Sequence, residues 1–348
     1  MLKKMLEERN LPEFKSREEM LDIMHKEVYG YLPEKPESIS FDVKKGIVYN
    51  FCADKAVLDK VDITAKLADG KEFTFPVYVT IPRKEGKIPF FICINFRDSV
   101  PDRYIPTEEI VDNGYAVLSF CYEDVTADND DFTNGLAGVL YEKGKRPDDG
   151  AGKIAMWAWA AQRVMDYAET LDCLDMEKSI VCGHSRLGKT ALVTAATDER
   201  FKFAYSNDSG CSGMAITRDK EGERVEHICT KFPYWFCENY KKYMGKEHEM
   251  PFDQHYLTAC IAPRYLYAAS AEQDTWADPI SEQLNCVATS KFYEDMGLTG
   301  FVCDKIAEVG DMFHDGTIGY HLRAGAHYFS REDWQKVIKF INKKASDA

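Results

Sequence analysis

The sequence lacks the long apolar runs that membrane-spanning proteins need. No stretch approaches the roughly 18–20 consecutive apolar residues that cross a bilayer. Residues 1–20 carry charges throughout and contain no apolar run of the kind found in signal peptides. We therefore expect a cytoplasmic protein, or a secreted one if a longer precursor carries a leader.

Positive charge is also scarce. The chain has 44 Lys and Arg residues against 58 Asp and Glu residues, which gives a formal net charge of −14. Because an acidic surface repels polyanions, we expect no nucleic-acid partner and no binding to anionic membranes.

Clusters with metal-ligand spacing are missing as well. The eleven cysteines are scattered, and even Cys229 and Cys237 are eight residues apart. The stretch 124–131 is acidic but lacks the spacing of a calcium-binding loop, so we interpret it as a solvated loop. We expect reduced cysteines in the core of a cytosolic protein, and neither a metal nor another cofactor.

The sequence has no Pro/Gly/Ser-rich linker, no repeat and no low-complexity tract. Its 348 residues, 45% of them hydrophobic and 29% charged, have an ordinary globular composition. We predict one catalytic domain over residues 41–348, preceded by a helical N-terminal lead-in over residues 1–40 that packs on it.

Hydrophobic periodicity predicts an α/β fold. Two alternating runs, 61–67 and 71–81, are joined through Asp69-Gly70, which is the signature of an antiparallel hairpin. The unbroken apolar runs 90–94 and 115–120 are typical of parallel strands covered on both faces. Helices are expected at 106–113 and 152–171, and further strands at 179–182, 203–207, 265–270 and 318–322. This alternation predicts a mostly parallel central sheet with helices on both faces and an N-terminal antiparallel hairpin.

A candidate nucleophile lies in residues 178–192. A β-rich run ends at Gly183, Ser185 follows, and a helix-forming run begins at once, as in a nucleophile elbow. The second glycine, Gly188, comes one residue later than in the usual G-x-S-x-G pattern. Flanking glycines suit a strained turn that leaves no room for a nearby Cβ atom.

The segment G-H-S-R-L-G-K around Ser185 resembles the elbow of glucuronoyl esterases, carbohydrate esterase family 15 of the α/β-hydrolase superfamily. The resemblance covers most of the chain. It extends over residues 94–97, 100–101, 105–110, 206–211, 251–255, 270–279 and 319–327. So many matches in one order are specific for this branch of the superfamily and less specific for the substrate.

His327 is the predicted catalytic base. It follows the last predicted strand in the loop Gly325-Ala326-His327, and the chain order Ser…Asp…His is the one expected of this fold. The resemblance places the family's base on the same residue. The competitors are His321, which lies in a strand pattern and is expected to be buried, His255, an interior histidine, and His184, which we interpret as structural.

Two carboxylates could orient the base. Asp274 follows the predicted strand 265–270, and Asp208 follows the strand 203–207, twenty-three residues beyond Ser185. The resemblance implies that either position, or both, can supply the acid. If both reach the imidazole, they titrate as a group coupled to His327.

Four further residues are predicted in the substrate site. The backbone N–H of Arg186 is the default oxyanion donor, and the resemblance implies that its side chain also faces that oxygen. The resemblance assigns sugar contacts to Lys189 and Glu223, and an aromatic at Trp276 suits a sugar ring. The alternatives are a surface lysine, a solvated charge run around Glu223 and a tryptophan in the core. The cluster 232–236 is expected to be core.

These residues predict a serine esterase that works through an acyl-enzyme. The resemblance implies that the acyl group is a glucuronoyl or 4-O-methyl-glucuronoyl unit, on substrates derived from xylan or lignin–carbohydrate material. Two alternatives stay open: an acetyl esterase acting on xylan or small acetylated sugars, and a non-catalytic carbohydrate-binding protein with the same fold.

Overall fold

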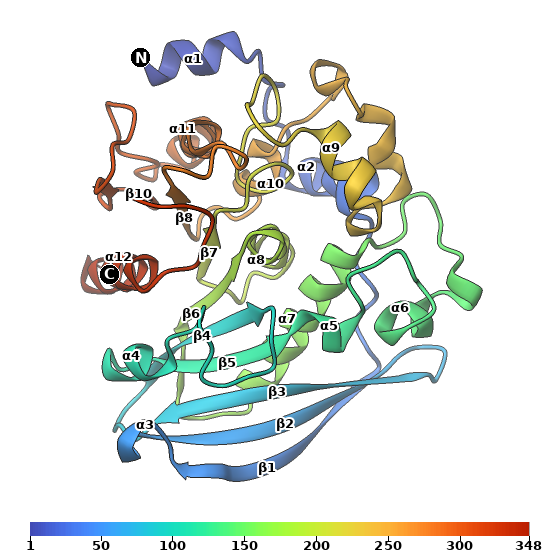
Figure 1. Ribbon diagram of the computed structural model, residues 1–348, viewed down its shortest axis with the longest axis vertical. Helices are drawn as coiled ribbons and strands as arrows, with labels where there is room; N and C mark the ends of the chain where they lie inside the picture. Colours follow the sequence, from blue (N-terminus) through green and yellow to red (C-terminus); the bar gives the residue numbers. More distant parts are fainter. Residues whose placement is uncertain (348) are drawn as a thin grey trace.

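The structure of the chain, a computed structural model, describes residues 1–347. Within this range one twisted sheet has the strand order β1-β2-β3-β5-β4-β6-β7-β8-β10-β9 (Figure 1). The strands are β1 (Ser38–Asn50), β2 (Ala56–Lys66), β3 (Glu72–Pro82), β4 (Ile88–Asn95), β5 (Ala116–Cys121), β6 (Leu174–His184), β7 (Phe203–Asn207), β8 (Tyr265–Ala271), β9 (Met312–Phe313) and β10 (Ile318–Arg323).

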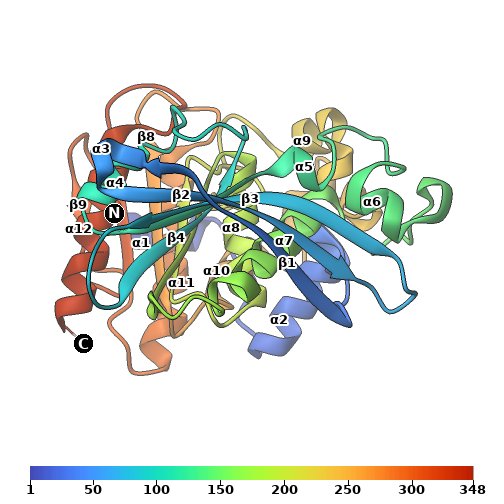
Figure 2. The ribbon, with the colours of Figure 1, turned by 90° about the horizontal axis from the view of Figure 1, so that it is seen from below.

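Helices lie on both faces of this sheet (Figures 1 and 2). They are α1 (Leu2–Glu8), α2 (Arg17–Met24), α3 (Phe51–Asp54), α4 (Thr107–Asp112), α5 (Tyr122–Val125), α6 (Gly135–Leu140), α7 (Lys153–Ala168), α8 (Arg186–Thr197), α9 (Val225–Lys231), α10 (His255–Ala259), α11 (Pro279–Asp295) and α12 (Arg331–Asp347). The mostly parallel sheet with helices on both faces confirms the predicted fold class.

The N-terminal antiparallel part of the sheet contains the predicted hairpin and one strand that was not predicted; a second such strand, the two-residue β9, pairs antiparallel with β10 at the opposite edge. β2 pairs with β3 so that Lys66 lies opposite Glu72, and Gly70 in the turn has φ +79°. The missed strand, β1, pairs with β2 at the edge of the sheet. Its residues are exposed or half-buried, so it has no apolar run to identify it.

The central parallel strands divide the core into two layers because successive side chains point to opposite faces. In β4, Phe90 and Ile92 join the larger cluster, to which α7 and α8 contribute. The intervening Phe91 packs on the other face with Tyr115 and Trp334, the latter from α12. Burial on both faces explains why these strands are unbroken apolar runs in the sequence.

The N-terminal helices contact the rest of the chain. α2 begins with a capping box in which Ser16 and Glu19 bond reciprocally, and its Met20 and Met24 are buried in the larger core cluster. The division of the chain at residue 40 stays a prediction. β1 begins at Ser38, just before that boundary.

Within residues 1–347 the chain has no disulfide bond. All eleven cysteines are unpaired, and eight of them are buried. In the same range, no helix is both long enough and apolar enough to cross a membrane.

Candidate active site

Ser185 lies at the sharp turn between β6 and α8. β6 is central in the sheet, between β4 and β7. Ser185 has φ +59° and ψ −126°, a conformation that costs a non-glycine residue about 1–3 kcal/mol and that is typical of functional turns. Its backbone N–H donates to the carbonyl of Asn207 on β7 (2.8 Å), which ties the strained turn to the neighbouring strand.

The two glycines of the elbow are required by close contacts rather than by their own dihedral angles. A Cβ atom on Gly183 would lie 2.2 Å from the carbonyl oxygen of Leu187. One on Gly188 would lie 3.0 Å from the hydroxyl oxygen of Ser206, so α8 could not pack as closely against β7. Gly188, one residue later than in the usual pattern, therefore still allows the helix after the turn to pack closely on the neighbouring strand.

His327 and Asp274 form a hydrogen-bonded pair beside this turn. Nδ1 of His327 donates to Oδ2 of Asp274 over 2.6 Å. The carboxylate side chain is 6% exposed, whereas the imidazole is 43% exposed. The ring of His327 lies 4.4 Å from that of His184, the residue before Ser185. With Nδ1 engaged by the acid, Nε2 is the nitrogen that remains for a proton transfer.

Asp208 lies close to this pair but has other partners. One of its oxygens accepts from the backbone N–H of Ala271 (2.8 Å), and the other from Nη2 of Arg323 (3.2 Å). Burial raises the pKa of Asp208 well above its ordinary value, and the nearby Glu282 and Asp333 add to the effect, against Arg323.

These three residues have the composition of a possible metal site. One potential ligand atom from each of Asp208, Asp274 and His327 lies within 4.8 Å of the others. However, both oxygens of Asp208 and the facing atoms of the Asp274–His327 pair are engaged in hydrogen bonds. The expectation that no metal takes part stays a prediction.

The other histidines near the site occupy buried positions. Nδ1 of His184 bonds Asn207 (2.6 Å), and burial together with His327 lowers the pKa of His184 to about 3, which keeps it neutral. His321 is fully buried between Asp333 and Tyr267.

His255 is an interior histidine with a hydrogen-bond partner for only one of its two ring nitrogens. Its Nε2 donates to the carbonyl of Pro12 (2.8 Å), while its buried Nδ1 has no partner among residues 1–347.

Arg186 is the first residue of α8, and its guanidinium forms an ion pair with Asp128. The group lies 4.6 Å from the ring centroid of Trp235, a cation–π contact. The interpretation of residues 124–131 as a solvated loop is therefore wrong at Asp128, whose side chain is 8% exposed. Trp235 is buried as expected of the 232–236 cluster, but it also contacts a predicted site residue.

Lys189 lies one helical turn after Ser185 and is buried, not exposed on the helix surface. Lys189 is 3% exposed, and its Nζ donates a hydrogen bond to the carbonyl of Ser209. Burial lowers the pKa of Lys189, and the nearby Glu223 opposes that effect most strongly. The alternative of a surface lysine is therefore wrong.

Glu223 and Trp276 come from two loops that are tied together. The backbone N–H of Glu223 donates to the carbonyl of Trp276 (2.9 Å), and Nζ of Lys220 bonds both carbonyls. Trp276 is 54% exposed, so the alternative of a core tryptophan is wrong. Its ring lies 5.3 Å from that of His227, a residue that no sequence pattern singled out.

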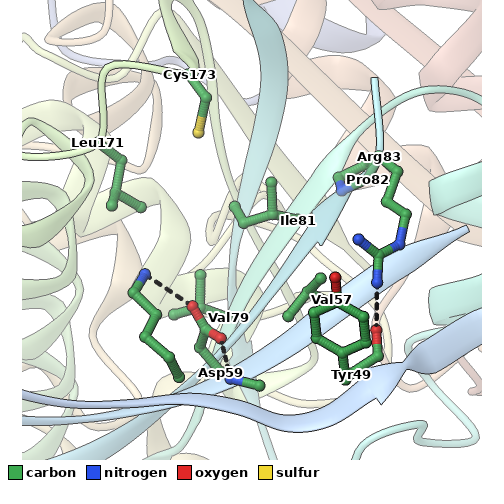
Figure 3. A pocket seen from close by; sticks show the side chains of 11 residues that line it. Tyr49, Val57, Asp59, Val79, Ile81, Pro82, Arg83, Leu171 and Cys173 are labelled. Carbon is green, nitrogen blue, oxygen red and sulfur yellow. Dashed lines mark hydrogen bonds and ion pairs between the residues drawn. The ribbon is translucent and has the colours of Figure 1, made fainter. Parts of the chain in front are cut away.

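A cavity elsewhere contains none of these residues. It has a volume of about 510 Å³ and lies against the antiparallel strands, lined by Val57 and Ile81 among others (Figure 3). Nζ of Lys45 donates to Asp59 (2.9 Å), and Arg83 donates to the carbonyl of Tyr49 (2.7 Å). None of the residues predicted for catalysis or sugar binding lines this cavity.

The chain is similar to known carbohydrate esterases. Residues 63–297 match the family described as glucuronyl esterase of fungi. A carbohydrate esterase from an unknown prokaryotic organism is 40% identical over 237 residues, 68% of this chain and 55% of that protein. A 4-O-methyl-glucuronoyl methylesterase 1 from Wolfiporia cocos is 26% identical over 301 residues, 82% of this chain and 67% of that protein.

Solved structures show the same relationship. A glucuronoyl esterase from Solibacter usitatus has a TM-score of 0.85 at 32% identity, covering 94% of this chain and 92% of that one. A carbohydrate esterase family 15 esterase from a marine bacterial metagenome, described as promiscuous, has a TM-score of 0.83 at 31% identity, covering 94% and 91%. The chain spans just over half the length of the prokaryotic relative, 55%. From the family match and these neighbours, the chain belongs to the glucuronoyl esterases of carbohydrate esterase family 15, with the α/β-hydrolase fold.

Proposed function

We propose that this protein is a serine carboxylic-ester hydrolase that cleaves esters of glucuronic acid or 4-O-methyl-glucuronic acid. The observation that carries the proposal is the strained elbow at Ser185 beside the hydrogen-bonded His327–Asp274 pair. Membership of the glucuronoyl esterase family supports the choice of acyl group. The substrates we propose are fragments of glucuronoxylan or of lignin–carbohydrate material, with no nucleic-acid or membrane partner.

In the proposed acylation step, the Ser185 hydroxyl attacks the ester carbonyl while Nε2 of His327 accepts its proton. Asp274 holds the imidazole in the tautomer with hydrogen on Nδ1 and stabilises the imidazolium. The backbone N–H and the guanidinium of Arg186 stabilise the oxyanion, and one such donor typically contributes about 3–4 kcal/mol. The imidazolium then protonates the leaving alcohol.

In the proposed deacylation step, His327 accepts a proton from water, and the resulting hydroxide attacks the acyl-enzyme. The same oxyanion donors act again, and Ser185 recovers its proton as the uronic acid leaves. Because the imidazole is 43% exposed, water can reach it without any movement of the protein.

We propose that Lys189, Glu223 and Trp276 recognise the uronoyl ring. The buried ammonium of Lys189 lies near Glu223, and such a pair can bond several sugar hydroxyls. The exposed Trp276 ring, on the loop tied to Glu223, offers a flat apolar surface of the kind that sugar faces pack against.

The second candidate is an acetyl esterase. His327 and Trp276 are both exposed, so the site is open to acyl groups of different sizes. A solved structure at 31% identity is that of an esterase described as promiscuous, which also favours acceptance of several acyl groups. A binding protein without catalysis is disfavoured, because it would not need the strained turn at Ser185.

The discriminating experiment compares kcat/KM for benzyl glucuronate, methyl glucuronate and 4-nitrophenyl acetate. We expect the glucuronate esters to be preferred, and Trp276→Ala to reduce that preference with little effect on the acetate. Tyr49→Ala is a matched control, because Tyr49 is another exposed aromatic residue, outside the site. A native preference for acetate would establish the acetyl esterase, and labelling by a serine-reactive phosphonate without any turnover would point to a different ester.

We also propose that the protein acts in the cytoplasm, on imported oligosaccharides. The eleven unpaired cysteines of the described chain, most of them buried, suit a reducing compartment. Fractionation of the source cells tests this, and recovery of the protein outside the cell would contradict it.

A further inference from the structure

The loop between α5 and α6 is held firmly by the core. Thr126 is fully buried, its hydroxyl accepts a hydrogen bond from Nζ of Lys153 (2.8 Å), and its carbonyl accepts one from Nε1 of Trp157 (3.2 Å). Oδ1 of Asn134 accepts from the next backbone N–H, that of Ala127 (3.0 Å). Lys153 and Trp157 belong to α7, so the position of residue 128 is set by a core helix.

At this fixed position, the carboxylate of Asp128 accepts hydrogen bonds from three donors. Its Oδ1 accepts from Nε1 of Trp235 (2.6 Å), and its Oδ2 accepts from the hydroxyl of Tyr122 (2.9 Å) and from Nη1 of Arg186. Two of the three donors, Trp235 and Tyr122, are neutral, so the negative charge of the carboxylate is balanced by the guanidinium of Arg186 alone among these donors. The carboxylate is satisfied on both oxygens.

The guanidinium of Arg186 is held by its ion pair with Asp128 and by aromatic rings, since the ring centroids of Phe232 and Phe96 lie 5.4 and 5.7 Å from it in addition to that of Trp235. Trp235 supports its face, and the ring of Phe232 is stacked on Trp235 at 4.0 Å. Asp128 takes a single N–H, on Nη1. Nε of Arg186 is buried and has no partner among residues 1–347, so the guanidinium keeps this position at a cost that its other contacts must offset.

We propose that Asp128, together with Trp235 and Tyr122, is the positioning device for the oxyanion-stabilising side chain of Arg186. Asp128 does not touch the reacting atoms. It anchors Nη1 so that the part of the guanidinium that remains exposed stays in place for the developing negative charge. Preorganised donors of this kind act in the transition state more than in the ground state. The inference rests on the proposed ester hydrolysis.

The first test compares Asp128→Asn with Asp130→Asn in the full chain. Asp130 is exposed on the same loop, so the two variants remove the same charge and only one breaks the anchor. We expect Asp128→Asn to lower kcat about 10- to 100-fold, less than the roughly 10²- to 10³-fold known for loss of one oxyanion donor, because the arginine is displaced and not removed, with KM changed less than about 3-fold. Asp130→Asn should keep the native values. An unchanged kcat in Asp128→Asn, or a rise in KM alone, would overturn the proposal.

The second test asks whether Asp128 acts through Arg186. Combined with Arg186→Ala, Asp128→Asn should cost less than about 2-fold in kcat, because the side chain it positions is already gone. Equal losses in both backgrounds would mean that Asp128 supports the fold generally, and the proposal would fail.

A milder variant keeps the test valid if Asp128→Asn does not fold. Trp235→Phe removes the Nε1 donor and keeps an aromatic ring against Phe232. We expect a smaller loss in kcat that again disappears in the Arg186→Ala background, and persistence of that loss would contradict the inference. An inactive native enzyme would instead contradict the proposed function, so the two failures are distinguishable.

Discussion

The loops that follow β7 and β8 each bring an aspartate to the same edge of the sheet, yet the two carboxylates have different partners. Asp274, after β8, hydrogen-bonds Nδ1 of His327 at 2.6 Å. Asp208, after β7, bonds the backbone of Ala271 and the guanidinium of Arg323. In sequence the two are equivalent, since each follows an apolar strand.

The two carboxylates therefore differ in their surroundings, although both lie near His327. Burial raises the pKa of Asp208 strongly, and Glu282 and Asp333 add negative charge nearby. Glu282 is itself fully buried, with a pKa raised by burial to about 7. The β7 loop thus lies among buried carboxylates, where Arg323 bonds Asp208 and Asp333 and Glu282 bonds the backbone of Gly210, whereas the β8 loop faces the exposed imidazole.

The largest expected effects set the scale for this comparison. Ser185→Ala and His327→Ala should each reduce ester turnover by about 10³-fold or more, because nucleophile and base act as one unit. Circular dichroism should show an intact fold in both. More than about a hundredth of native turnover in either variant would remove that residue from the mechanism.

The next effect separates the two acids. Asp274→Asn should lower kcat by about 10²-fold or more, because an amide opposite Nδ1 favours the wrong tautomer. The loss should stay below that of His327→Ala, since Asp208 lies within 4.8 Å and can approach the imidazole. Asp208→Asn should cost about 10-fold or less, as it leaves the His327–Asp274 bond in place.

The double variant Asp208→Asn/Asp274→Asn sharpens the comparison. If Asp208 substitutes for the missing acid, the double variant loses more than the product of the single losses. If Asp208→Asn proves as inactive as His327→Ala while Asp274→Asn is active, the assignment of the two acids must be exchanged.

A smaller effect concerns stability and pH. Because the folded state raises the pKa of Asp208 above its ordinary 3.8, folding favours the protonated form. This contribution is present at low pH and is lost as the pH rises through the folded pKa. Asparagine mimics the neutral carboxyl, and Arg323 keeps its bonds to Asp333. The Tm of Asp208→Asn should therefore improve relative to the native protein as the pH rises from about 4.5 to 8.

Thermal melts at several pH values measure this difference, with Asp130→Asn as the control for loss of one surface charge. A Tm difference that does not change with pH, or one that favours the native protein more at high pH, would show that Arg323 outweighs the burial of Asp208.

The last prediction is that removal of metal ions has no effect on turnover. EDTA should leave turnover unchanged, because the serine mechanism needs no metal-activated water. The test bears on the comparison, since a metal shared by Asp208, Asp274 and His327 would make the two acids equivalent ligands. Loss of activity in EDTA that zinc or calcium restores would support such a site.

The sequence was sufficient wherever local pattern fixes structure. Strands buried on both faces need continuous apolar residues, so β4, β5 and β8 could be predicted, and the elbow at Ser185 followed from glycines between a strand and a helix. The edge strand β1 was missed: Ile39, Phe41 and Val43 alternate with polar residues, but this pattern covers only the first half of the strand, and none of its residues is fully buried.

What only the tertiary structure decided is the environment of the polar side chains. Asp128 has the sequence context of a solvated loop, but its partners Arg186 and Trp235 lie 58 and 107 residues away and bury it. Lys189 bonds the carbonyl of Ser209, and Asp208 bonds Arg323 although it lies close to His327. Hydrogen bonds and charges act over a few ångströms in space, so a linear pattern can propose which residues serve a site, and only packing determines how they divide the work.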